Sequence, residues 1–153
     1  MRRASAAARP VAAITMPEEP TQALRFGKAR TSRSAALLED YVELIADLLA
    51  VHGEARATEV AKRLGVTRPT AVKSVARLKR EGLATARPYR GIFLTELGRE
   101  LADRVCARHR LVVKLLLAVG VRAEAAEADA GGMEHYASQA TLKAFARFLA
   151  RPK

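Results

Sequence analysis

Hydrophobic residues recur three and four positions apart along much of the chain, which is the spacing of one face of an α-helix. The pattern predicts helices over residues 34–52, 58–64 and 68–79. Gly53 is a stop signal after the first helix, and Thr67 is a suitable N-cap for the third. The predicted order is therefore a long helix, a short helix, a glycine-containing turn and a third helix.

Two short extended segments follow these helices. Residues 83–87 and 92–95 are joined by a Pro-Tyr-Arg-Gly sequence whose proline and glycine favour a turn. Helices in this order with a hairpin behind them are typical of a winged helix-turn-helix, in which the second helix of the motif enters the DNA major groove. We therefore expect the hairpin to be the wing.

The rest of the chain is predicted to be helical. Thr95 caps a helix over residues 96–119, and Ser138 caps a last helix before the C-terminus. Between them, residues 122–136 form an alanine-rich helix that Gly131 and Gly132 should weaken. The fold class is thus mainly α with a small β-hairpin: a winged helix-turn-helix domain plus a helical domain for dimerisation, since palindromic DNA favours twofold symmetry.

Composition is that of a globular protein. Half of the 153 residues are hydrophobic, yet the longest apolar runs fall short of the roughly 20 residues that a membrane span needs. Cys106 is the single cysteine, so no disulfide within the chain is expected. These features predict a cytoplasmic protein with no membrane partner.

Charge is segregated along the chain. Residues 34–55 carry −5 and residues 56–90 carry +8, within a total of +11. Residues 1–33 carry +5 and include three prolines without periodicity, so we expect a mobile basic arm that either adds phosphate affinity or only aids solubility. The acidic stretch suits a cation, and the basic stretch suits double-stranded DNA.

Candidate DNA-contacting side chains lie on the third predicted helix and the hairpin. Residues near the start of that helix are placed to read base edges: Arg68, Thr70, Lys73 and Ser74. Residues farther along are better placed for phosphates, which set register without reading sequence: Arg77, Arg80, Arg87 and Arg90. A solvated basic face without a ligand is the structural alternative.

Carboxylates and imidazoles form a second candidate group. Asp40 and Glu43 are three residues apart and share one helical face. His109 lies in the apolar stripe of the long helix, and Glu134 and His135 follow the weak helix. Taken singly, such residues are more often solvated or core residues than ligands, but together they would suit manganese or iron.

The chain resembles the diphtheria-toxin-repressor (DtxR) family of metal-dependent transcriptional regulators, in its short form without a C-terminal SH3-like domain. The resemblance covers about residues 35–150 and is strongest in these stretches: 40–45, 53–56, 63–66, 89–95, 108–109 and 132–135. It implies that the metal ligands are Asp40, Glu43, His109, Glu134 and His135. It also implies a manganese-responsive repressor of metal-transport genes that binds palindromic operator DNA as a homodimer, with iron or another divalent transition metal as the alternative.

One position departs from the family pattern. Gly131 stands where the resemblance implies a carboxylate that bridges two metal ions, and Asp129, two residues away, points elsewhere on a helix. We therefore expect either a weaker second ion or one ion with added water. The implied regions are the arm over 1–33, a DNA-binding domain over 34–95, and a metal-binding and dimerisation domain over 96–153.

Two other classes of function are weighed against this one. A metal-dependent hydrolase could use Glu134 as its base, but no HExxH spacing, nucleophile or oxyanion device accompanies it. A metal-independent winged-helix regulator could sense oxidants through Cys106, near Arg104 and Arg108, although a buried inert thiol is commoner. Loss of DNA binding with a chelator, rescued by manganese and not by a thiol reductant, would exclude the oxidant sensor.

Overall fold

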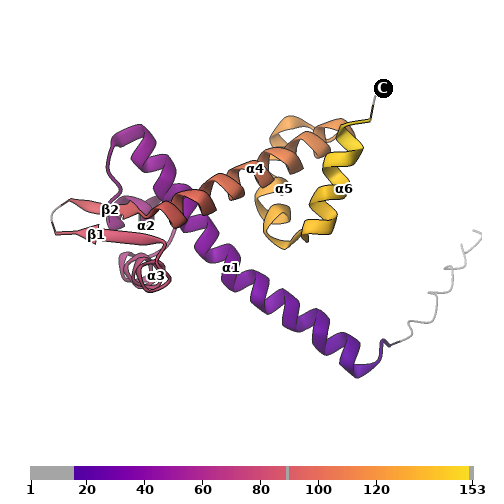
Figure 1. The fold of residues 1–153 in the computed structure, drawn as a ribbon, viewed down its shortest axis with the longest axis horizontal. Helices are drawn as coiled ribbons and strands as arrows, with labels where there is room; N and C mark the ends of the chain where they lie inside the picture. Colours follow the sequence, from indigo (N-terminus) through magenta and orange to yellow (C-terminus); the bar gives the residue numbers. More distant parts are fainter. Residues whose placement is uncertain (1–15, 89, 152–153) are drawn as a thin grey trace, which may run out of the picture.

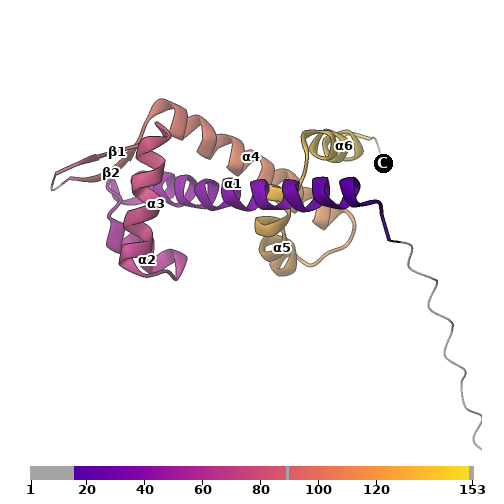
Figure 2. The same ribbon diagram turned by 90° about the horizontal axis from the view of Figure 1, so that it is seen from below.

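The computed structural model describes residues 16–88 and 90–151. Its elements follow in the predicted order, mainly α with one small hairpin: α1 (Glu19–His52), α2 (Ala57–Leu64), α3 (Arg68–Arg80), β1 (Ala84–Arg87), β2 (Gly91–Leu94), α4 (Glu96–Ala118), α5 (Ala123–Tyr136) and α6 (Gln139–Leu149). Helix α2, helix α3 and the hairpin lie at one end of the molecule, α5 and α6 lie away from them, and α1 and α4 connect the two groups (Figures 1 and 2).

Helix α1 begins at Glu19, well before the expected start at Ser34. The expectation that residues up to 33 lack regular structure is therefore wrong for residues 19–33, whereas residues 1–15 lie outside the described part. The first turns of α1 were not predicted because few of their side chains are packed against the rest of the protein. Leu24 and Phe26 are exposed, and the first buried residue is Ala36. Without a buried face, these turns carry no hydrophobic period to read.

Helices α2 and α3 pack with α1 around one hydrophobic cluster, whose interior includes Tyr41, Ile45 and Leu78. The predicted cap of α3 is confirmed, because the hydroxyl of Thr67 accepts a hydrogen bond from the backbone N–H of Thr70 at 3.3 Å. The α1 segment that carries Asp40 and Glu43 is thus part of the same packed unit as α3.

Strands β1 and β2 pair antiparallel, with Ala84 opposite Leu94 and Arg87 opposite Gly91. The hairpin is held against the segment between α1 and α2 by a hydrogen bond of 2.7 Å from the N–H of Ile92 to the carbonyl oxygen of Ala55. Gly91 has a positive φ of 88°, and a β-carbon there would lie 2.6 Å from that same oxygen, so the close approach requires glycine.

Helix α4 leaves the hairpin through Thr95, whose hydroxyl caps the helix at Gly98 N–H and donates to the Gly82 carbonyl. It then contacts α1, α5 and α6. A second, smaller hydrophobic cluster around Val112, with Ala130 and Leu142, joins α4 to α5 and α6. Helix α5 runs unbroken through Gly131 and Gly132, so the expected weak point does not interrupt it.

No helix in residues 16–88 and 90–151 combines the length and the apolar character that crossing a bilayer requires.

Candidate metal centre and DNA-binding surface

The side chain of His135 joins α5 to α1. Its Nε2 lies 2.9 Å from Asp40 Oδ1, and its Nδ1 lies 2.6 Å from Glu39 Oε2. The imidazole is 5% exposed, so these two carboxylates are its main polar surroundings. Residues almost a hundred positions apart in the chain therefore meet at one point between the two halves of the molecule.

The hydrogen bonds to Asp40 and then to Glu39 raise the pKa of His135 to about 10, against the opposing effect of burial. The pKa of Glu39 is lowered because its bonds to His135 and Arg108 outweigh its own desolvation. At neutral pH the imidazolium is therefore the positive partner of two carboxylates. A metal ion at this position would have to replace that proton.

Glu134 occupies the interior of the same region. Its side chain is 1% exposed, its Oε1 lies 3.3 Å from His109 Nδ1 and 3.9 Å from His135 Nε2, and burial raises its pKa. Among the described residues, its Oε2 is buried without a hydrogen-bond partner. A buried carboxylate oxygen in this state is an acceptor that is open to a cation.

His109, from α4, completes the contact between the helices. Its Nδ1 faces Glu134 and its Nε2 lies 2.9 Å from Glu127 Oε2. Although burial lowers its pKa, the bonds to Glu127 and Glu134 outweigh that effect and raise it. Glu43 is half-buried, and desolvation raises its pKa against the opposing charges of His109 and His135.

Four of the five residues that the sequence indicated are joined by contacts: Asp40, His109, Glu134 and His135. The fifth, Glu43, is close enough for the charges of both rings to oppose the desolvation that raises its pKa. The imidazoles pair with carboxylates rather than sharing one centre with them. Accordingly, no group of three or more His, Cys, Asp or Glu side chains in residues 16–88 and 90–151 could hold a metal ion as it stands. The donor types still fit manganese or iron, because oxygen and imidazole ligands dominate and Glu134 Oε2 is unpaired.

Sequence reasoning missed three residues of this cluster. Glu39 and Arg108 form a largely buried ion pair at 2.6 Å, and Glu127 binds His109 from the next helix. Glu39 and Arg108 were not predicted because each is the immediate sequence neighbour of a candidate ligand. Adjacent residues of a helix ordinarily point to different faces, so neither was expected at the same site. For Glu127, its helical spacing of seven from Glu134 was the one available signal.

The candidate DNA-contacting residues are mostly exposed along α3 and the hairpin, including Arg68, Lys73, Arg80 and Arg90. Ser74 is a correction, because it is only 9% exposed and lies on the inner face of α3, where it cannot reach a base edge. Arg77 is partly engaged within the protein, since it donates to Glu81 at 2.9 Å and to the hydroxyl of Ser34 at 3.0 Å.

Thr70 and Arg87 are exposed but also have contacts inside the protein. The hydroxyl of Thr70 lies 2.8 Å from that of Thr67, so it takes part in the cap of α3. The guanidinium of Arg87 lies 5.8 Å from the centre of the Phe93 ring, within the range of a cation–π contact. Of the residues that remain free on the surface, Arg68 and Arg90 are the clearest probes of the helix and the wing.

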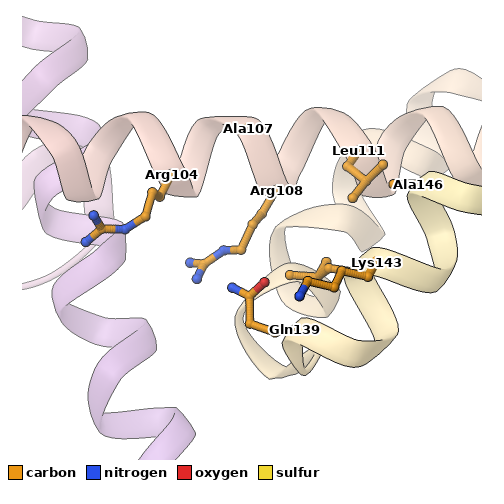
Figure 3. A pocket seen from close by; sticks show the side chains of 8 residues that line it. Arg104, Ala107, Arg108, Leu111, Gln139, Lys143 and Ala146 are labelled. Carbon is orange, nitrogen blue, oxygen red and sulfur yellow. The ribbon is translucent and has the colours of Figure 1, made fainter.

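A groove of about 360 Å³ lies between α4 and α6, apart from the carboxylate and imidazole cluster. Arg108 points from α4 toward Gln139 on α6, whereas Arg104 also lines the groove but extends away from α6 (Figure 3). Its lining contains no carboxylate or imidazole. The groove is therefore not the candidate metal centre, although Arg108 connects the two through Glu39.

Models of two protein domains match this chain. Residues 35–92 match the iron dependent repressor N-terminal DNA binding domain. Residues 95–153 match the iron dependent repressor metal binding and dimerisation domain. Both matches together span most of the chain and meet at the junction of the hairpin with α4.

Curated relatives and solved structures agree with these matches. The transcriptional regulator MntR of Escherichia coli O6:H1 is 46% identical over 123 residues, which is 80% of this chain and 79% of that protein. MntR of Lysinibacillus sphaericus is 36% identical over 66% of this chain and 73% of that protein. The structure of the manganese regulator SloR superposes with a TM-score of 0.65 at 27% identity, covering 76% of this chain and 54% of that one.

A second solved structure is a manganese-dependent transcriptional repressor in complex with manganese. It superposes with a TM-score of 0.63 at 27% identity, covering 74% of this chain and 53% of that one. This chain thus spans about half the length of those two structures, whereas it spans most of the length of the curated relatives.

Proposed function

Because the chain belongs to the iron-dependent repressor family, the diphtheria-toxin-repressor family of metal-dependent transcriptional regulators, we propose that it is a manganese-responsive repressor that binds operator DNA as a homodimer. The observation that carries the proposal is the contact of Asp40 with His135, which links the DNA-reading unit to the helical unit. Members of this family regulate transcription, so Glu134 is assigned to metal binding and not to catalysis.

The proposed ligands are divided between the two units. Asp40 and Glu43 belong to α1, which packs with the DNA-reading helix α3, whereas His109, Glu134 and His135 belong to α4 and α5. A bound divalent ion supplies a positive charge that carboxylates and imidazoles from both units can share. The oxygens of Asp40 and Glu134 and the two rings would then hold α1 against α5 in a single arrangement.

Holding α1 fixes the direction of α3 through the shared core of Tyr41, Ile45 and Leu78. In a twofold dimer, the two α3 helices must lie about 34 Å apart to enter successive major grooves on one face of DNA. Metal binding stabilises the DNA-competent arrangement only to the extent that the ion binds this arrangement more tightly than the others. By the same linkage, operator DNA must tighten metal binding.

We propose that the dimer surface is built by residues 111–119, at the C-terminal end of α4, together with α6. Three large apolar side chains there are exposed in the single chain: Leu117 at 45%, Val119 at 60% and Phe148 at 46%. These residues belong to the region that matches a dimerisation domain. Large apolar side chains exposed there are therefore suited to burial against a second copy of the chain. We place its action in the cytoplasm, where chromosomal operators are accessible, and expect metal-transport genes among its targets.

The test is operator binding by the purified full chain against a panel of divalent ions at one stated salt concentration. Manganese should restore the binding that a chelator removes, and a thiol reductant should not. If binding survives chelation unchanged, the metal requirement is refuted. If iron restores binding and manganese does not, the proposed metal is wrong while the regulator remains metal-dependent. Cys106, half-buried on α4, would be implicated only by rescue with reductant.

A further inference from the structure

Both imidazoles of the cluster are held in the same way. His135 presents Nε2 to Asp40 and Nδ1 to Glu39, and His109 presents Nδ1 to Glu134 and Nε2 to Glu127. In each ring, one nitrogen faces a proposed ligand carboxylate and the other faces a carboxylate outside the proposed ligand set. The outer partners are therefore Glu39 for His135 and Glu127 for His109.

From this geometry we propose that Glu127 is a positioning residue for the metal site: it accepts the hydrogen of His109 Nε2 and so leaves the Nδ1 lone pair, on the side of Glu134, available to an ion. The inference rests on the proposed metal function. The sequence offered only the spacing of seven residues from Glu134 as a signal for this role.

The chemistry of imidazole supports this division of roles. A neutral ring carries hydrogen on one nitrogen and a lone pair on the other, and only the lone pair can bind a metal. An ionised carboxylate is an acceptor only, so it selects the nitrogen that carries hydrogen. Metal-binding histidines commonly donate their second N–H to a carboxylate or carbonyl, which fixes the tautomer and the ring orientation.

The geometry of the imidazole ring indicates that Glu127 does not itself bind the ion. The two ring nitrogens point away from each other, so a carboxylate bound at Nε2 cannot also reach an ion bound at Nδ1. The surroundings agree, because Glu134 at Nδ1 is 1% exposed whereas Glu127 at Nε2 is 64% exposed. The ion is expected on the buried side, where Glu134 Oε2 has no partner in the described part of the chain.

Position on the helix explains how Glu127 reaches the ring. It precedes Glu134 on α5 by seven residues, close to two full turns, so both carboxylates face α4. His109 on α4 lies between them, with contacts of 2.9 Å to Glu127 and 3.3 Å to Glu134. Removing the Glu127 carboxylate would leave that ring without its outer partner while the packing of α5 through Ala126 and Ala130 persists.

The test compares Glu127→Ala, Glu127→Gln and, as a matched control, Glu124→Ala in the full chain. Glu124 is another exposed acidic residue of α5. Free manganese would be followed by electron paramagnetic resonance, and the exchange of the His109 Nε2 proton with water by NMR of zinc-loaded protein. Glu127→Ala should weaken manganese binding by about tenfold or more at unchanged stoichiometry, and the Nε2 proton of His109 should exchange faster because it has lost its acceptor.

Glu127→Gln should bind manganese within about threefold of the parent chain, because its amide oxygen still accepts from Nε2–H. Glu124→Ala should match the parent chain. Unchanged affinity in Glu127→Ala would overturn the inference, and so would loss of a bound ion, because that result makes Glu127 a direct ligand. If the parent chain binds no manganese at all, the proposed metal function fails first, and the two failures are thereby told apart.

Discussion

Asp40 Oδ1 lies 2.9 Å from His135 Nε2, so a residue of the DNA-binding half directly contacts a residue of the metal-binding half. Through this contact, the binding of a metal ion at the cluster can change the direction of α3. At neutral pH the imidazolium of His135 is the positive charge between Asp40 and Glu39.

Removing either end of the link should uncouple DNA binding from metal. In Asp40→Ala or His135→Ala, manganese-dependent operator binding should be abolished, because the shared ion loses one of its ligands and the direct contact between the two units is lost. The dimer should persist by size-exclusion chromatography with light scattering, since neither residue belongs to the proposed dimer surface. Asp103→Ala, which removes an exposed carboxylate from α4, serves as control. Unchanged metal-dependent binding in either variant would refute the clamp.

Restoring a carboxylate at position 131 should strengthen a second metal site. Apart from the backbone of its own helix, no described residue would come within 4 Å of a β-carbon at Gly131, so a side chain can begin there without a clash. Calorimetric titration of Gly131→Glu with manganese should show two tight ions per chain, against one tight ion in the parent.

The control for this change is Gly131→Ala. Alanine should stabilise α5 by about 0.5–1 kcal/mol through helix propensity, without adding a ligand, so its stoichiometry should equal that of the parent. Two equally tight ions in the parent chain would show that Gly131 does not limit the site.

Helix α3 and the wing should contribute to DNA binding in different ways. Arg68→Ala should cost about 1–3 kcal/mol and relax sequence preference, if the guanidinium reads a base edge. Arg90→Ala should weaken all sequences alike and reduce the salt-dependence slope by about 0.9, as expected for a phosphate contact. Fluorescence anisotropy over a salt series measures both quantities. Ser74→Ala is the control, because its buried side chain should leave the slope and the preference unchanged.

The stability of the metal-free chain should fall as pH rises above neutrality. Bonds to Asp40 and Glu39 raise the pKa of His135 from its ordinary 6.5 to about 10. A group whose pKa is higher when folded stabilises the fold fully below the unfolded value, and this contribution is lost as pH rises through the folded value. Urea unfolding with a chelator present should therefore show decreasing stability between about pH 6.5 and pH 10.

The same proton competes with metal, so manganese affinity should increase over that range while the stability of the metal-free chain decreases. His135→Gln should flatten the stability profile. His52→Gln, an exposed histidine in the last turn of α1, should leave it unchanged. A profile in the parent that matches that of His135→Gln would contradict the role assigned to this ion pair.

Local chemistry by itself determined most elements of the fold. The caps at Thr67, Thr95 and Ser138 each start a helix where a side-chain oxygen can accept from the first turn, and all are present. The hairpin and its glycine were likewise predicted from turn chemistry. The close approach of Gly91 to Ala55 explains why this position requires glycine. These signals are readable because they depend only on residues a few positions apart.

The five proposed ligands were also found in the sequence, but only as a set implied by family resemblance. Three-residue spacing placed Asp40 and Glu43 on one face, yet no spacing could show that His135 would reach them. That contact depends on how α5 packs against α1 and α4.

Only the tertiary structure decided which side chains surround the imidazoles. Glu39 and Glu127 became visible once three helices were placed together, because hydrogen bonds between distant helices leave no periodic trace in a sequence. Packing also decided that Ser74 faces the core and that α1 begins at Glu19. Local sequence specifies which atoms a residue can offer, and the arrangement of helices determines which of those atoms meet.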